Sequence, residues 1–217
     1  MADNAPIARS PIVPPQPIQV VDGWEISGRR SSAPLRVTDC TPLAKVIVRA
    51  DQSSDTARQL GVGFGRAARD AQGALVIGSG PGEWTILGGV GSAAEIMQRI
   101  AQPEGAHVTV VDSTHGRALI RITGADGARM LSKLCPVDLS DKVTPDGAAF
   151  RSSVAALVTD VIRDDVNDAT NGSSNGGKTR SYLLHCERSS GQYLLDTLLD
   201  AGAEFGIEVD GFTKPGV

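Results

Sequence analysis

The feature that most constrains the fold is a pattern of elements that occurs twice along the chain. In the first copy, a β-branched run at residues 45–49 predicts a strand, and Asp55 stands where the cap of a following helix is expected. In the second copy, residues 118–122 predict a strand, and Asp126 takes the same place before a helix over 128–134. This correspondence predicts a chain made of two related halves.

The elements that follow also correspond, because each copy continues with two strands and a closing helix. These elements are strands 73–78 and 83–87 with helix 92–100, and strands 154–162 and 181–186 with helix 190–203. In the last helix Leu194, Leu195, Leu198 and Leu199 share one face at helical spacing. We therefore expect an α+β fold, a pseudo-twofold pair of ferredoxin-like units that bury their helix faces together. The half-repeats span about 37–105 and 106–212.

Two segments fall outside this pattern. Residues 1–36 are rich in proline, which predicts an extended arm without regular packing, either disordered or ordered as a strap on a partner. We expect the arm to be separable, so that its deletion leaves the domain at 37–217 folded. Residues 164–179 are rich in Gly, Ser and Asn and predict a mobile loop.

Charge and hydropathy exclude several classes of partner. A net charge of −4 argues against nucleic acid or an anionic membrane as a binding partner, because both bind proteins through clustered Lys and Arg. The longest apolar runs, such as 154–158, are far shorter than the ~20 residues that span a bilayer. The N-terminus has Asp3 and several prolines but no continuous apolar stretch, so it is a poor signal peptide. We expect a cytoplasmic protein.

Cysteine and histidine usage predicts neither disulfides nor a metal site. The cysteines are odd in number and widely spaced, which is typical of reduced core thiols; they are Cys40, Cys135 and Cys186. A metal site needs several ligands that converge, whereas the histidines lie in separate predicted elements; they are His107, His115 and His185.

Two glycine-rich motifs invite a nucleotide-binding interpretation. Residues 172–179 match the phosphate-loop pattern and end in Lys178 and Thr179, but such a loop must leave a strand and enter a helix. Here a predicted strand follows, so we interpret the match as a hairpin loop. Residues 61–65, GVGFG, lack the final glycine of a dinucleotide fingerprint and follow a helix, which indicates a helix-to-strand connection.

Acidic residues near the end of a predicted strand are the remaining candidates for chemistry. Asp160, Asp164 and Asp165 could hold an amine or act as a base, although acidic residues at a hairpin end are more commonly solvated. No nucleophile lies in a recognisable strained turn, so the sequence does not predict a hydrolase. We assign no catalytic, cofactor-binding or metal-binding residue to the chain.

Three segments carry a resemblance to a known family: GSGPGEWTIL at 78–87, VVDSTHGRALIRITGADGARMLSKLCPVDL at 110–139, and RSYLLHCERSSGQYLLDTLLDAGAEFGIEV at 180–209. Over residues 37–212 the chain resembles the gamma subunit of heterotetrameric sarcosine oxidase, a relative of the aminomethyltransferase and folate-binding family. The resemblance implies the folate-binding fold of the transferases without their chemistry. The chain departs from the usual pattern of this family in the proline-rich arm and in the insertion at 164–179.

The resemblance also implies where the transferase site would lie. The segment CPVDL at 135–139 keeps the family's aspartate, Asp138. The position of the transferase Asn falls near Ala155 or Ala156, and Asp164 or Asp165 lies about where the catalytic Asp of the transferases would lie. An alanine side chain cannot hydrogen-bond a pteridine. A bound folate is therefore not expected on this chain.

The complex that the resemblance implies contains alpha, beta and delta subunits as partners. FAD, FMN, NAD, tetrahydrofolate and zinc would belong to those subunits, with no cofactor on this one. The implied reaction is oxidative N-demethylation of sarcosine, or a related N-methyl amine, to glycine and hydrogen peroxide, with the methyl carbon released as formaldehyde or passed to folate. This chain would be a non-catalytic structural subunit of that oxidoreductase. The alternative is a stand-alone folate-binding protein similar to the aminomethyltransferases.

Overall fold

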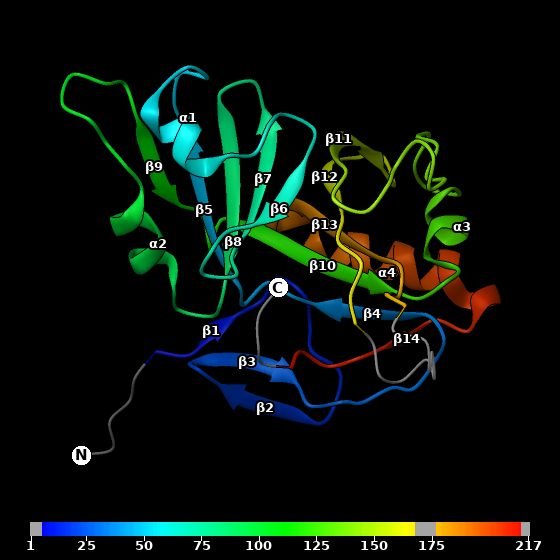
Figure 1. Ribbon diagram of the computed structural model, residues 1–217. Coiled ribbons are helices and arrows are strands. Elements are labelled where there is room, and N and C mark those ends of the chain that lie inside the picture. The colour runs from blue at the N-terminus through cyan, green and yellow to red at the C-terminus, as the bar shows by residue number, and fades with distance from the viewer. Residues whose placement is uncertain (1–5, 168–176, 214–217) are drawn as a thin grey trace, which may run out of the picture.

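The computed structural model describes residues 6–167 and 177–213. Two β-sheets stand side by side with helices on their outer faces, and a small third sheet lies beneath them (Figure 1). Among the helices of these residues, none combines the length and the apolar character needed to cross a membrane. The predicted mobile loop at 164–179 lies largely outside the described residues.

A five-stranded antiparallel sheet, in the order β6-β7-β8-β5-β9, contains the strands of the first half and one strand, β9, from the second. Its strands are β5 (Ala44–Arg49), β6 (Ala67–Arg69), β7 (Leu75–Gly80), β8 (Glu83–Gly88) and β9 (Thr109–Asp112). Helix α2 (Ala93–Arg99) packs Ile96 against Val46 and Val48, the residues of β5 that alternate onto this face. Helix α1 (Asp55–Leu60) begins at Asp55, but Ser54 caps it by accepting a hydrogen bond from the Ala57 N–H.

A six-stranded sheet, in the order β11-β12-β13-β10-β4-β14, contains the strands of the second half and one strand, β4, from the first. Its strands are β4 (Arg36–Asp39), β10 (Arg117–Thr123), β11 (Ala149–Val154), β12 (Leu157–Arg163), β13 (Ser181–Glu187) and β14 (Glu208–Val209). Helices α3 (Gly127–Leu131) and α4 (Gly191–Gly202) cover its outer face, where Leu194 and Leu198 are fully buried against Ile120 and Leu184. In both halves the second strand of the hairpin pairs with the first strand of that half. The two-fold relation between ferredoxin-like units stays a prediction.

The predicted strand at 154–162 is present as β12, but it begins three residues later, because a turn separates it from β11, which ends at Val154. Ala155 and Ala156 form this turn with φ of 51° and 63°. The Ala155 N–H donates to Leu134 O at 3.0 Å, and the Tyr193 hydroxyl donates to Ala155 O at 3.2 Å. Both bonds are made by Ala155 and hold it in a conformation that alanine disfavours, so the local sequence gave no turn signal.

The inner faces of the two sheets meet in a shared apolar layer. Leu75, Ile77 and Leu87 of the first sheet belong to one buried cluster with residues of the second; these are Leu119, Ala149, Ile162 and Leu183. The two halves therefore share one core instead of standing as separate domains.

The N-terminal segment is not the irregular arm that its prolines predict. It forms a three-stranded sheet, β1-β3-β2, from Ala8–Arg9 (β1), Trp24–Ser27 (β3) and Ile18–Val21 (β2). Trp24 and Ile26 are buried in the layer between the two large sheets. The prolines lie outside the strands, so the segment keeps the N–H groups that its ladders need.

Candidate functional site

A buried carboxylate at the end of β12 joins the two large sheets. Asp164 is 8% exposed and accepts hydrogen bonds from Arg69 of β6, whose Nη2 lies 3.1 Å from both carboxylate oxygens. The Nη2 of Arg121, on β10 of the other sheet, donates to Asp164 Oδ2 at 2.8 Å. The carboxylate is thus held by two guanidinium groups that approach from different sheets.

Asp165 is fixed in a similar way on the other side of the strand end. Arg163 donates to its two oxygens from Nε at 3.0 Å and from Nη2 at 2.9 Å, and the Ser181 N–H donates to Oδ1 at 3.1 Å. The expectation that these acidic residues are solvated is wrong for Asp164 and Asp165, because guanidinium groups replace the water, from Arg69 and Arg121 at Asp164 and from Arg163 at Asp165. A carboxylate that already accepts paired guanidinium bonds has few lone pairs left for a substrate amine.

A second charged cluster is centred on Asp160, which is 6% exposed. Arg151 donates to it from Nε at 2.6 Å, Arg117 lies 3.5 Å away, and His185 Nδ1 lies 3.3 Å away. Burial alone would raise the pKa of Asp160, but the hydrogen bonds from His185 and Arg151 and the charge of Arg151 outweigh it and hold this pKa below its usual range. Asp160 is thus kept as an anion.

His185 is only 2% exposed, and its Nε2 has no hydrogen-bond partner in the described part of the chain. Burial lowers the pKa of His185, while the hydrogen bond to Asp160 opposes that shift. The ring is therefore neutral at pH 7. Its ring lies buried beside Asp160, with Nδ1 toward the carboxylate.

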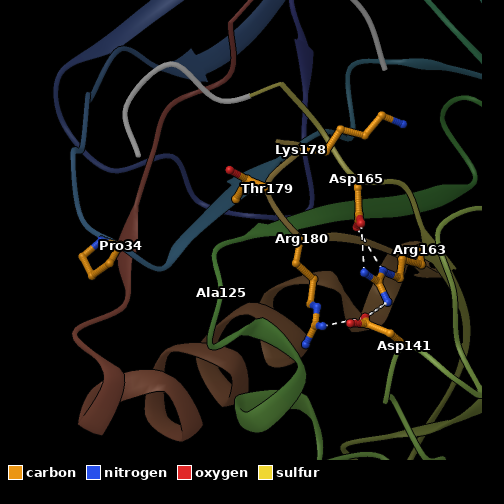
Figure 2. Close-up of a pocket in the computed structure, with 8 residues that line it drawn as sticks. All are labelled: Pro34, Ala125, Asp141, Arg163, Asp165, Lys178, Thr179 and Arg180. Atoms are coloured by element: carbon orange, nitrogen blue, oxygen red, sulfur yellow. Dashed lines mark hydrogen bonds and ion pairs between the residues drawn. The ribbon is translucent and has the colours of Figure 1, made fainter. Parts of the chain in front are cut away.

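A pocket with a volume of about 570 Å³ lies beside Asp165 (Figure 2). It is lined by Pro34, Ala125, Asp141, Arg163, Asp165, Lys178, Thr179 and Arg180. Figure 2 shows Arg163 between Asp165 and Asp141, with Arg180 bonded to the other side of Asp141. The acidic groups of this pocket are already paired with arginines, so it contains charge but no free base.

The phosphate-loop match does not have the structure that phosphate binding requires. Lys178 Nζ pairs with Asp146 at 2.8 Å, and Thr179 forms an antiparallel bridge with Val166. Strand β13 then begins at Ser181, as the sequence predicts, so the lysine does not enter a helix. Residues 172–176 of the motif lie outside the described residues. The GVGFG segment connects α1 to β6, which confirms its interpretation as a helix-to-strand connection.

The remaining candidates are dispersed. The three cysteines are free and buried, as predicted. His107 and His115 are exposed, His115 stacks on Trp24 with ring centroids 4.9 Å apart, and no metal-binding group of acidic, His and Cys side chains exists within residues 6–167 and 177–213. Asp138 is exposed and accepts a hydrogen bond from the Ser140 N–H in its own loop, so it does not join the paired carboxylates.

The arginines that hold the carboxylates were not singled out in the sequence. Arg117 and Arg121 alternate with apolar residues along β10, which places them on the face that meets the first sheet. Arginine on the inner face of a predicted strand was the available signal, because a buried guanidinium needs an anion opposite it. Arg69 and Arg151 lie in strands that the pattern did not predict.

Two solved structures are similar to this chain over most of its length. One is heterotetrameric sarcosine oxidase from Corynebacterium sp. U-96 in complex with pyrrole 2-carboxylate, with a TM-score of 0.62 and 20% sequence identity, where the match covers 84% of this chain and 88% of that chain. The other is the glycine cleavage system aminomethyltransferase T from Bartonella henselae, with a TM-score of 0.65 and 11% identity over 89% of this chain and 55% of that chain. No protein-family model and no curated protein matches the sequence. The two likenesses confirm the fold that the sequence resemblance implied.

Proposed function

We propose that this chain is a structural subunit, of the gamma type, in a complex similar to heterotetrameric sarcosine oxidase. The complex carries out oxidative N-demethylation of sarcosine or a related N-methyl amine in the cytoplasm, with alpha, beta and delta subunits as partners. Those subunits carry the flavins, NAD, tetrahydrofolate and zinc. This chain supplies no reacting group and helps to hold the other subunits in their working arrangement.

The observation that carries this proposal is the state of the carboxylates. Asp160, Asp164 and Asp165 are each bound by arginines, so a base that could take a proton from an amine is lacking among them. The structural match over 88% of a chain of a sarcosine oxidase supports the choice of complex. It leaves little of that chain without a counterpart here.

The alternative is a stand-alone folate-binding protein similar to the aminomethyltransferases, and the TM-score of 0.65 favours it. The residues present fit a pteridine poorly. Ala155 and Ala156 offer no side-chain hydrogen bond, and the main-chain groups of Ala155 are already bonded to Leu134 and Tyr193. The match to the transferase also covers only 55% of that protein.

One purification distinguishes the two functions. The tagged chain is expressed in its native host, the assembly is isolated, and its other chains are identified by mass spectrometry. We expect three further subunits and amine-dependent peroxide production with bound flavin. A chain that purifies alone and binds tetrahydrofolate with micromolar affinity in calorimetry would favour the alternative.

A double substitution then tests the structural role. Asp164→Asn with Asp165→Asn should lower activity only in proportion to the complex that is lost. Full assembly with abolished turnover would make this chain a catalyst and would contradict the proposal.

A further inference from the structure

The connection between α1 and β6 presents an aromatic side chain to solvent. Phe64, the fourth residue of the GVGFG segment, is 63% exposed, and it is one of only four phenylalanines in the chain. Burial of such a ring against another surface is favourable, so it is a good anchor if its position is fixed. The contacts of the loop decide whether the ring is mobile or is held in a fixed position.

The first sheet holds the loop through main-chain bonds. The Gly65 N–H donates to Gly78 O at 3.0 Å, and the Gly78 N–H donates to Arg66 O at 2.8 Å. The indole Nε1 of Trp84 donates to Val62 O at 2.7 Å. The residues on both sides of Phe64 are therefore tied to β7 and β8.

Close backbone approach explains why glycines surround the ring. A Cβ atom at Gly78 would lie 2.2 Å from Gly63 O, so only glycine allows β7 to touch the loop. Gly65 has a φ of +80°, a conformation that a side chain would strain. The glycines of this motif fit the loop closely against the strand instead of making it flexible.

The second sheet holds the same loop from the other side. The Ala149 N–H, at the start of β11, donates to Gly65 O at 3.0 Å, and the Ala67 N–H donates to Gly147 O at 2.8 Å. Phe64 therefore stands on the line where the two sheets join. An anchor fixed in this way loses little conformational entropy when it is buried by a partner.

A cationic residue follows Phe64 two positions later in the same connection. Arg66 is exposed, and no ion pair within the described part of the chain includes it, whereas the chain as a whole carries a net charge of −4. Aromatic residues and arginine are the types most enriched at protein interfaces and at their energetic centres. A positive group beside an apolar anchor also selects an acidic surface over a basic one.

We infer that Phe64 is an anchor that inserts into an apolar socket on another subunit, and that Arg66 pairs with a carboxylate at the rim of that socket. This inference rests on the proposed function, because it requires an assembly of different chains. It adds the contact residue and the chemistry of the partner surface.

The test uses the complex purified through the tagged chain from its native host. Phe64→Ser should lower the yield of assembled complex roughly tenfold or more, as for a central interface residue, while the thermal melt of the chain stays unchanged. Arg66→Glu should give a smaller loss that grows at low salt. Val143→Ser is the matched control, because Val143 is 55% exposed and lies in a different loop, and its yield should equal that of the unaltered chain.

A photoreactive p-benzoylphenylalanine at position 64 identifies the partner directly. We expect a cross-link to one other subunit, at a peptide that contains apolar residues and Asp or Glu. If the complex forms but Phe64→Ser assembles normally, or the cross-link joins two copies of this chain, the inference is wrong and the proposed function stands. If no further subunits are purified at all, the proposed function itself fails.

Discussion

Each buried carboxylate between the sheets is bonded to arginines from other strands, and Asp164 shows what this does for stability. Arg121, which donates to it, has a side chain only 11% exposed, whereas Asp141 of the pocket is 69% exposed. Asp164→Asn should therefore lower the free energy of unfolding by about 2–4 kcal/mol, since it leaves a buried guanidinium without its charge partner. The control Asp141→Asn should cost less than about 1 kcal/mol. Urea denaturation of both variants gives the comparison, and equal effects would contradict the buried pairing.

The Asp160 and His185 pair makes stability depend on pH. Burial lowers the pKa of His185 in the folded chain below its usual value of 6.5. Near this pH the unfolded chain therefore binds one proton more than the folded chain does. Stability should fall as the pH drops below about 6.5, and should fall further as the pH passes through the lowered pKa of Asp160. The two cations that act on the ring stay protonated in this range. Arg117 does not titrate, and burial lowers the pKa of Lys45 to about 8, which is still above the pH at which His185 titrates.

His185→Asn should remove the first of these losses, because an amide can still donate to Asp160 but does not titrate. The urea midpoint of this variant should change little between pH 7 and pH 5, whereas that of the unaltered chain should decrease. His107→Asn is the control, since His107 is exposed, and it should keep the original profile. A flat profile in the unaltered chain would contradict the buried neutral histidine.

Lys178 has a surface role despite its place in the phosphate-loop pattern. Its side chain is 55% exposed and pairs with Asp146. Lys178→Ala should change the free energy of unfolding by less than about 1 kcal/mol and should leave the activity of the complex unaltered. Calorimetry with MgATP should show no binding, and saturable micromolar binding that this substitution abolishes would overturn the interpretation.

At the scale of elements, α4 closes the core of the second half. Leu198 is 0% exposed there, whereas Leu199 is only partly buried at the edge of the same cluster. Leu198→Ala should lower the free energy of unfolding by about 2–5 kcal/mol, from lost burial and the remaining cavity, and Leu199→Ala should cost clearly less. Denaturant melts measure both. A loss under about 0.5 kcal/mol for Leu198→Ala would place this face in solvent.

Elements with their own periodicity were predictable from the sequence, and elements defined by contacts were not. The strands β5, β10 and β13 and the helix α4 lie where the pattern placed them, because alternation and helical spacing record which side chains face the core. The turn at Ala155 depends on bonds from residues 21 and 38 positions away, which no local rule contains. The paired carboxylates could not be predicted for the same reason. The sequence pointed to Asp164, but its partner Arg69 lies 95 positions away and contacts it only in the folded chain.

The whole molecule is held together by its N-terminal segment more than composition suggests. Proline content limits the local backbone conformation of a segment, whereas contacts with the rest of the chain determine how residues 8–35 fold. Ile12 and Leu35 are buried in the core of the second half, and Trp24 and Ile26 in the layer between the sheets. The segment therefore packs on its own chain, and its role toward a partner is limited to the surface that it leaves exposed.

Deletion of residues 2–36 should consequently unfold the chain, contrary to the expectation from its prolines. The burial of each large apolar side chain contributes about 1.5–3 kcal/mol, so four of them account for about 6–12 kcal/mol. That is comparable to the whole stability of a typical domain, about 5–15 kcal/mol.

Adjacent residues provide the matched test, because Ile12 is 1% exposed and Val13 is 73% exposed. Ile12→Ala should lower the melting temperature by several degrees, as a loss of about 2–5 kcal/mol requires, while Val13→Ala should leave it unchanged. A deleted chain that still melts cooperatively at the original temperature would show that the segment is a separable arm after all.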